Sequence, residues 1–187
     1  MRLLTDVEIT QLAIDYALIT PFLSSKVSTV TNVLTNKVTK IWSYGLEPLG
    51  YTFRSSLEGE LQTPEETASI ESQCTQDADG RTYLCIGSGE YLLLKTVESV
   101  KMPADVTILN FTGKSTCEIR QGGKTHSTQV EPGYEGRLTF GVSNPTPNPI
   151  KFYLLEGAIQ ANFIKVDKAP DTLYDGHYQG GNRLHSI

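Results

Sequence analysis

The sequence predicts a mainly β protein, either a barrel or a sandwich, that begins with a helix. The first observation is that short apolar runs alternate with turns containing Gly and Pro from residue 83 onwards, a spacing typical of all-β domains. The second is a helix signal over residues 1–22. A chain of 187 residues can bury a substantial core, so we expect residues 1–187 to form one domain.

The N-terminal helix is predicted from its first turn. Thr5, followed three residues later by Glu8, resembles a capping box, in which each residue satisfies a free N–H at the helix start. The helix should end before Thr20-Pro21, because a proline disfavours helical backbone in the residue before it. A helical repeat places these apolar side chains on one face: Ile9, Leu12, Ala13 and Tyr16.

Between residues 23 and 80 the sequence alternates extended and polar stretches. Residues 23–40 are rich in Thr, Ser and Val, which favours an extended arm or an edge strand. Residues 41–54 combine aromatic strand formers with two glycines and a proline, which predicts a strand, a turn and a second strand. Residues 58–80 contain polar turn sequences, so we expect an exposed insertion there.

Apolar runs in the second half of the chain predict the remaining strands. The tail, residues 174–187, is polar and rich in glycine, so we expect it to be mobile unless a ligand or a neighbouring subunit holds it. The predicted strands are residues 83–86, 91–95, 106–111, 138–142, 150–154 and 158–166.

Composition and charge exclude several function classes. The formal net charge is −5, so the chain lacks the basic surface of a typical nucleic-acid-binding protein. We find no secretion signal and no apolar run of the roughly 18 residues that span a bilayer, so we expect no membrane partner. The protein is expected in the cytoplasm, or in a virion if its role is structural. Cys74, Cys85 and Cys117 are widely spaced, which argues against a thiolate metal site.

Residues 113–120, Gly-Lys-Ser-Thr-Cys-Glu-Ile-Arg, carry the densest chemistry. A glycine, two cations and two adjacent hydroxyls can all donate hydrogen bonds to the oxygens of a phosphate chain. These residues alone are compatible both with a phosphate-binding turn and with an ordinary polar turn between two strands. The sequence lacks the second glycine of a P-loop, and it lacks the His-x-Glu and Pro-Cys-x-x-Cys ligands of zinc deaminases.

The order of several segments resembles the dCTP deaminase branch of the trimeric dUTPase superfamily. Residues 41–54, IWSYGLEPLGYTFR, are similar to its "ISYG…YGYD-R" segment. Residues 89–105 are similar to its "GE…LA-T-E-V-LPAD" segment, and residues 113–116 to its "GRSS/GKST" phosphate-binding turn. Residues 131–136 are similar to its "-P-(W/F/Y)-EG" segment, and residues 177–180 to its C-terminal "KYQG" lid.

This resemblance implies a β-clip type of barrel that assembles as a homotrimer, with nucleotide sites between subunits and no zinc. It implies that Mg²⁺ accompanies a deoxynucleoside triphosphate if the site is active. Glu131 becomes the candidate catalytic residue, because it lies where the dUTPase branch has an aspartate that activates water for pyrophosphate cleavage. Tyr134 lies where that branch packs a tyrosine against deoxyribose. The implied nucleotide-binding residues are Gly113, Lys114, Ser115, Thr116, Arg120, Tyr134, Tyr174, His177, Tyr178 and Gln179.

The sequence departs from the family pattern at the position of the general base. Residues 136–144 read GRLTFGVSN where the family has "G-x-x-T-L-E-F-S-N", so Gly141 stands in the place of the glutamate that acts on the attacking water. Thr52 likewise replaces the aspartate of "GYD-R". A general base typically contributes on the order of a hundred- to ten-thousand-fold in rate. We therefore expect a protein that has lost deamination.

Three functions follow from these expectations. In the first, the trimer has lost catalysis and serves as a binding or structural protein, for example a decoration or cement protein on a viral shell. In the second, it is an active deoxynucleotide enzyme, either a deaminase with a relocated base such as Glu118 or a diphosphatase that uses Glu131. In the third, it is a sensor or sequestering protein that binds a deoxynucleoside triphosphate without hydrolysing it.

Overall fold

The computed structural model describes residues 1–27, 29–32, 37–40 and 50–181, and these residues form a mainly β protein with a short N-terminal helix, as predicted. The first part of the predicted strand pair over residues 41–54, residues 41–49, lies outside the described residues. The elements are β1 (Arg2–Leu3), α1 (Asp6–Tyr16), β2 (Ile19–Thr20), β3 (Thr29–Asn32), β4 (Lys37–Lys40), β5 (Tyr51–Gln62), β6 (Thr67–Ser69), β7 (Thr75–Gln76), β8 (Thr82–Ile86), β9 (Tyr91–Lys101), β10 (Val106–Gly113), α2 (Ser115–Gln121), β11 (Lys124–His126), β12 (Glu135–Ser143), β13 (Ile150–Tyr153) and β14 (Gly157–Lys165), with 3₁₀ turns at Ser24–Lys26 and Ile70–Ser72.

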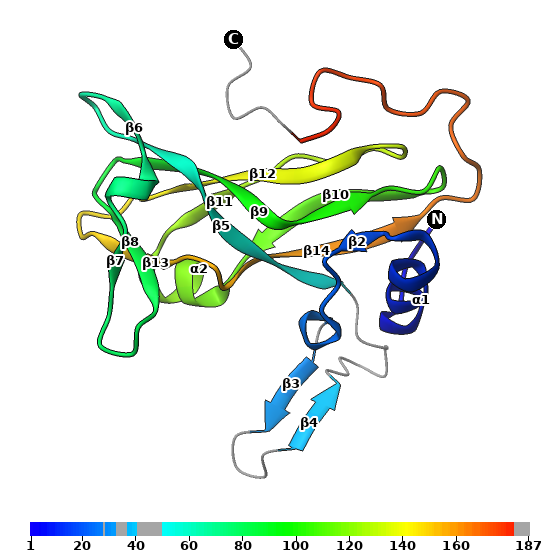
Figure 1. The fold of residues 1–187 in the computed structure, drawn as a ribbon, viewed down its shortest axis with the longest axis horizontal. Coiled ribbons are helices and arrows are strands. Elements are labelled where there is room, and N and C mark those ends of the chain that lie inside the picture. Colours follow the sequence, from blue (N-terminus) through cyan, green and yellow to red (C-terminus); the bar gives the residue numbers. More distant parts are fainter. Residues whose placement is uncertain (28, 33–36, 41–49, 182–187) are drawn as a thin grey trace.

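A curled antiparallel sheet makes up most of the molecule (Figure 1). Its strands follow the order β1-β14-β5-β9-β12-β11, and β10, β2 and β6 pair with β14, β9 and β5 respectively. A separate sheet has the order β13-β8-β7, and β3 pairs with β4 in a hairpin that projects away from the main sheet (Figure 1). Each apolar run predicted as a strand in the second half of the sequence forms one, namely β8, β9, β10, β12, β13 and β14.

The core is built from buried apolar residues of the main sheet together with those of β8 and β13 in the small sheet. Alternate residues of β5 point inward, so Tyr51 and Phe53 are completely buried. The two rings meet edge to face with centroids 5.0 Å apart, and Phe53 also packs against Phe163 of β14. This aromatic contact joins neighbouring strands of the sheet.

The capping box at the start of α1 is present as predicted. The Thr5 hydroxyl accepts the N–H of Glu8, and the Glu8 carboxylate accepts the N–H of Thr5. The helix is shorter than the predicted span 1–22. It ends at Tyr16, because Ala17 adopts the left-handed conformation and the chain then continues into β2.

Two other expectations need correction. Residues 58–80 are not an exposed insertion throughout: residues 58–62 continue β5, and Leu61 and Ile70 are buried in the core. The described part of the C-terminal tail is held by its own chain. The N–H of Tyr174 donates to the carbonyl of Pro132, and the N–H of Gly180 donates to the carbonyl of Glu135. In Figure 1 the tail accordingly returns over the end of β12.

Candidate functional site

The turn at residues 113–116 connects β10 to α2, so it is not a turn between two strands. Gly113 ends β10, Lys114 is the cap of α2, and Ser115 and Thr116 are its first residues. The side chains of Lys114, Ser115, Thr116 and also Arg120 are exposed to solvent. The turn therefore presents its cations and hydroxyls outward, as a phosphate-binding turn requires.

Glu118 holds this turn in place. One of its carboxylate oxygens accepts the N–H groups of Gly113 and Thr125, each at 3.2 Å, and so ties the end of β10 to β11. A Cβ atom at Gly113 would overlap this carboxylate and the Thr125 hydroxyl, so glycine is required by the close approach. Glu118 thus has a structural role, which makes it a poor candidate for a relocated general base.

A cavity of about 440 Å³ lies next to the turn that precedes β12, and we call it the first cavity. The Glu131 side chain accepts a hydrogen bond from the amide of Gln129 at 2.9 Å. The rings of Tyr134 and Tyr174 meet edge to face at 5.7 Å. Burial raises the pKa of the Tyr134 hydroxyl to about 12, so this group stays protonated. The cavity is lined by Phe111, Thr128, Gln129, Val130, Glu131, Tyr134, Leu138, Thr139, Tyr174 and Tyr178.

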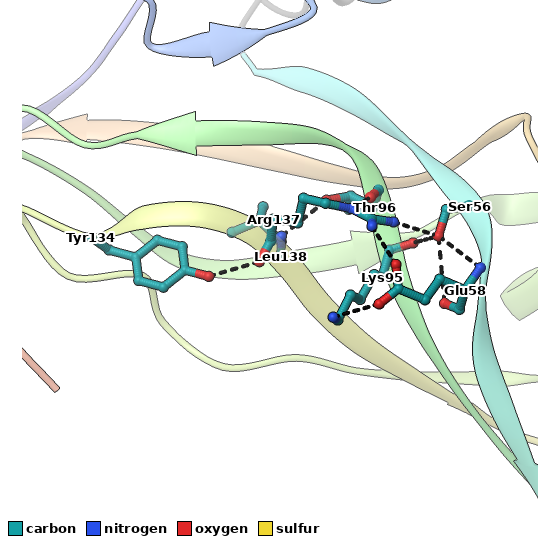
Figure 2. Close-up of polar contacts among 7 residues, drawn as sticks. All are labelled: Ser56, Glu58, Lys95, Thr96, Tyr134, Arg137 and Leu138. Carbon is teal, nitrogen blue, oxygen red and sulfur yellow. Dashed lines mark hydrogen bonds and ion pairs between the residues drawn. The ribbon is translucent and has the colours of Figure 1, made fainter. Parts of the chain in front are cut away.

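A polar network fixes the orientation of Tyr134 in the wall of this cavity. Figure 2 shows the Tyr134 hydroxyl donating to the carbonyl of Arg137, at 2.7 Å. The Arg137 guanidinium in turn donates to Ser56 and pairs with Glu58, which also binds Lys95. The pairing of β12 with β9 is irregular between Arg137 and Thr139, and the pairing of β5 with β9 is irregular at residues 55–59. The network therefore fills the space between two bulges and holds the chain next to Tyr134.

The C-terminal tail closes one side of the first cavity with Tyr174 and Tyr178. The N–H of Tyr178 donates to the Tyr174 hydroxyl at 3.1 Å, and the rings of His177 and Tyr178 meet edge to face. The Gln179 amide donates to the carbonyl of Gly133 and accepts the N–H of Glu135. The structure thus brings Glu131, Tyr134, Tyr174 and Tyr178 to one cavity, with Gln179 bound beside it.

Gly141 lies in the middle of β12, buried beneath the side chain of Tyr91. Ser143 pairs with Tyr91 and Gly141 with Leu93, so Tyr91 and Gly141 are diagonal neighbours on one face of the sheet. A Cβ atom at Gly141 would overlap the Tyr91 hydroxyl, and it would lie 2.8 Å from the ring atom Cε2. The Tyr91 ring also contacts His126, whose Nε2 is 2.8 Å from the Ser143 hydroxyl. The space beside Gly141 is therefore filled.

A second cavity, of about 310 Å³, lies beside the 113–116 turn. Lys114 and Thr116 line it together with Arg81 of the β7–β8 turn and Lys151 of β13. Sequence reasoning missed Arg81 and Lys151. The available signal was the alternation of a cation with an aromatic residue two positions on, in Arg81-Thr82-Tyr83 and Lys151-Phe152-Tyr153. Thr52 lies close by, because its methyl group and the Lys114 side chain both flank Gly157.

Within one protomer, six of the predicted site residues line one or the other of the two cavities, and Gln179 lines a separate hollow next to Glu135 and Arg137. Lys114 and Thr116 line the second cavity, whereas Glu131, Tyr134, Tyr174 and Tyr178 line the first. Among the residues that the structure describes, no group of three His, Cys, Asp or Glu side chains is placed to hold a metal ion. None of the described helices is long and apolar enough to cross a membrane.

The curled sheet, the glycine–lysine turn and the docked C-terminal tail together fit the class of protein predicted from the segment order, and comparison with known proteins agrees. The chain belongs to the dCTP deaminase-like family, because the sequence model of that family matches residues 3–163. It is 34% identical over 178 residues to a dCTP deaminase of Rickettsia rickettsii (strain Sheila Smith), covering 93% of this chain and 90% of the relative. It is 32% identical over 187 residues to a dCTP deaminase of Herpetosiphon aurantiacus, covering 96% and 95% respectively.

A solved structure supports the fold. The crystal structure of a 2'-deoxycytidine 5'-triphosphate deaminase from Agrobacterium tumefaciens superposes with a TM-score of 0.52 at 17% sequence identity. The likeness covers 86% of this chain and 46% of that one. The predicted dCTP deaminase-like fold is therefore confirmed.

Proposed function

We propose that this protein is a homotrimer that binds a pyrimidine deoxynucleotide and does not deaminate it. Membership of the dCTP deaminase-like family supports the ligand class. The exposed Gly113–Lys114 turn, and the cavity with Glu131 and Tyr134, support a retained nucleotide site. The expected role was that of a binding or a structural protein. Nothing among the described residues points to a capsid-like partner, so we propose the binding role, with a nucleotide as the ligand.

The observation that carries this proposal is the packing of Tyr91 over Gly141. The resemblance places the general base of the family at residue 141, and a glycine has no group that can move a proton. Because the Tyr91 hydroxyl fills the space beside Gly141, a side chain at this position would have to displace Tyr91. Burial also raises the pKa of the Tyr91 phenol, so it remains protonated at neutral pH and does not substitute as a base.

The division of the site residues between two cavities supports assembly as a trimer. The resemblance implies that each nucleotide site lies between subunits, and neither cavity of one protomer contains all of the expected residues. In a threefold assembly the 113–116 turn of one protomer can complete the first cavity of its neighbour. A magnesium ion that keeps mostly water and phosphate ligands fits such a site, with Glu131 as the nearby carboxylate.

The test is a panel of deoxynucleoside triphosphates for which binding, by calorimetry, and products, by ammonia release and chromatography, are followed in the same samples. We expect binding of at least one pyrimidine nucleotide and no ammonia. The double variant Gly141→Glu/Tyr91→Ala supplies a carboxylate together with the room it needs, and Gly141→Glu alone is its matched control. Ammonia release from dCTP by the unmodified protein would overturn the proposal, as would the absence of binding to any nucleotide.

A second candidate is an active deoxynucleotide enzyme, and the similarity to curated relatives favours it. Those relatives are named dCTP deaminases and align over more than nine tenths of this chain. Glu131, which lines the first cavity beside Tyr134, would be the base in a diphosphatase reaction. The same panel separates the cases, since a diphosphatase releases pyrophosphate, and Glu131→Gln should abolish that release while nucleotide binding persists.

A further inference from the structure

We propose that the second cavity binds the phosphate chain of the nucleotide, and that Arg81 and Lys151, which belong to a different sheet from the 113–116 turn, are ligands of that chain together with Lys114. The inference rests on the proposed function insofar as the phosphate chain belongs to a nucleotide. The resemblance assigns a phosphate role to the turn alone. The contribution of the small β13-β8-β7 sheet emerges only in the folded molecule.

The charges around the second cavity are unbalanced. Arg81, Lys114 and Lys151 line it, opposed by the single lining carboxylate of Glu156. Both oxygens of Glu156 are taken by Arg81, at 2.6 and 2.9 Å. Among the described residues no carboxylate pairs with Lys114 or Lys151. Two positive charges therefore face one cavity without a counter-charge, and such a site favours an anion.

The cations from the small sheet are held in fixed positions. The Arg81 guanidinium lies 3.7 Å from the centroid of the Tyr153 ring, and the Lys151 ammonium lies 3.8 Å from that of Tyr83. The Gln121 side chain accepts the N–H of Lys151 at 2.8 Å and donates to its carbonyl at 3.1 Å, which attaches β13 to α2. Side chains that are ordered before binding lose less entropy when a ligand arrives.

The third cation, Lys114, reaches the second cavity by passing close to a glycine. Lys114 lies against Gly157 at the start of β14, and a Cβ atom there would approach the Lys114 ammonium to 3.2 Å. Thr116 adds a hydroxyl to the same wall. The volume of about 310 Å³ lies at the small end of ligand sites, so it suits a phosphate chain with the sugar and base outside. A chain of linked phosphates presents several charges, which matches a wall whose cations come from separate elements.

The experiment compares a nucleotide with two ligands that each reproduce only one part of it, either the phosphate chain or the nucleoside. Inorganic tripolyphosphate, dCTP and deoxycytidine are titrated calorimetrically into the full chain, its Lys151→Met variant and a Lys168→Met control. Lys168 is an exposed lysine that lines neither cavity, and its variant makes the same change in net charge. Because a charged hydrogen bond contributes about 1.5–3 kcal/mol, we expect Lys151→Met to weaken tripolyphosphate and dCTP roughly tenfold or more. Deoxycytidine binding should be unchanged, and the control should match the unmodified protein.

The outcomes separate this inference from the proposed function. If the protein binds dCTP and deoxycytidine but not tripolyphosphate, or if Lys151→Met binds dCTP normally, the phosphate assignment is wrong and the proposed function stands. If tripolyphosphate binds and neither deoxycytidine nor any nucleotide adds affinity, the cavity is a phosphate site and the nucleotide proposal fails. An unchanged melting temperature of Lys151→Met, measured beside each titration, shows that the variant is folded.

Discussion

At the scale of single residues, Gly141 and Tyr91 occupy one space that can hold only one side chain. Gly141 is buried in β12, and the hydroxyl end of Tyr91 covers it. Two acids were considered as replacements for the base, and their carboxylates differ in how firmly other groups hold them. Glu118 is bound to two backbone N–H groups, whereas Glu131 lines a cavity and contacts Gln129. Residue identity alone does not show this difference.

We predict that Gly141→Ala destabilises the protein by about 1–3 kcal/mol, because the new methyl group overlaps the Tyr91 hydroxyl. Combined with Tyr91→Ala, the same substitution should cost less than it does alone, since the space is then open. The measurement is urea unfolding of the two single variants and the double variant, which gives the coupling free energy. We expect a coupling of at least about 0.5 kcal/mol. Strictly additive effects would show that the two residues do not compete for the space.

At the scale of elements, strands β5, β9 and β12 are joined by charges as well as by backbone hydrogen bonds. Glu58 of β5 pairs with Lys95 of β9, whose side chain is only 5% exposed, and with Arg137 of β12 (Figure 2). The irregular register on both sides of β9 gives these side chains room to meet. The backbone carbonyl of Arg137 also accepts a hydrogen bond from the Tyr134 hydroxyl, so the network connects the sheet to the first cavity.

The variant Glu58→Gln should destabilise the protein at neutral pH by about 1–3 kcal/mol, because it leaves the buried Lys95 without its counter-charge. The hydrogen bond from Lys95, and next that from Arg137, hold the pKa of Glu58 below its ordinary 4.5. The folded pKa therefore lies below the unfolded one. The stabilisation is present above about pH 4.5 and is lost as the pH falls through the lowered pKa.

Unfolding free energies at several pH values check this prediction. The difference between the unmodified protein and Glu58→Gln should be constant near neutral pH and shrink below about pH 4.5. Glu65→Gln is the matched control, since Glu65 is an exposed residue in the turn before β6 and its loss should change stability by less than about 0.5 kcal/mol. A difference that persists unchanged at low pH would mean that the charge of Glu58 is not what stabilises the network.

At the scale of the whole molecule, one protomer keeps the residues of the proposed nucleotide site apart. The turn with Lys114 faces the second cavity and the wall with Tyr134 faces the first. The tail is bound to its own chain through the Pro132 and Glu135 carbonyls, so Tyr174 and Tyr178 are already positioned in the wall of the first cavity. A threefold assembly accounts for this arrangement, since it joins a turn from one subunit to a cavity of the next.

Mixing of two disabled variants tests the assembly. Lys114→Ala and Tyr134→Ala should each bind nucleotide poorly as pure trimers. After co-refolding in equal amounts, roughly one quarter of the sites should combine an intact turn with an intact cavity and regain the unmodified affinity. Calorimetric stoichiometry of the mixture measures that fraction, and sedimentation equilibrium establishes the trimer. A site contained within one subunit would give no recovery on mixing.

The sequence by itself determined the main strands of the second half, the start of the N-terminal helix and the family. The positions of β8, β9, β10, β12, β13 and β14, and the capping box at Thr5 and Glu8, depend on periodicity and on neighbours a few residues apart, which are readable without a structure. Helix α2 and strand β11 were not predicted. The order of short segments was enough to predict the dCTP deaminase-like family. The burial of residues 58–80 was misjudged, because this mostly polar segment also contains Leu61 and Ile70, which are buried in the core.

The tertiary structure alone decided what surrounds each candidate residue. Tyr91 covers Gly141 because the register of β9 against β12 places them diagonally, fifty residues apart in the chain. Arg81 and Lys151 reach the cavity of Lys114 because a separate sheet packs against α2. The tail docks on Glu135 through the Gln179 side chain and through the backbone N–H of Gly180, and the backbone part of this contact carries no sequence signal. Contacts of this kind depend on register and long-range packing, which local patterns do not encode.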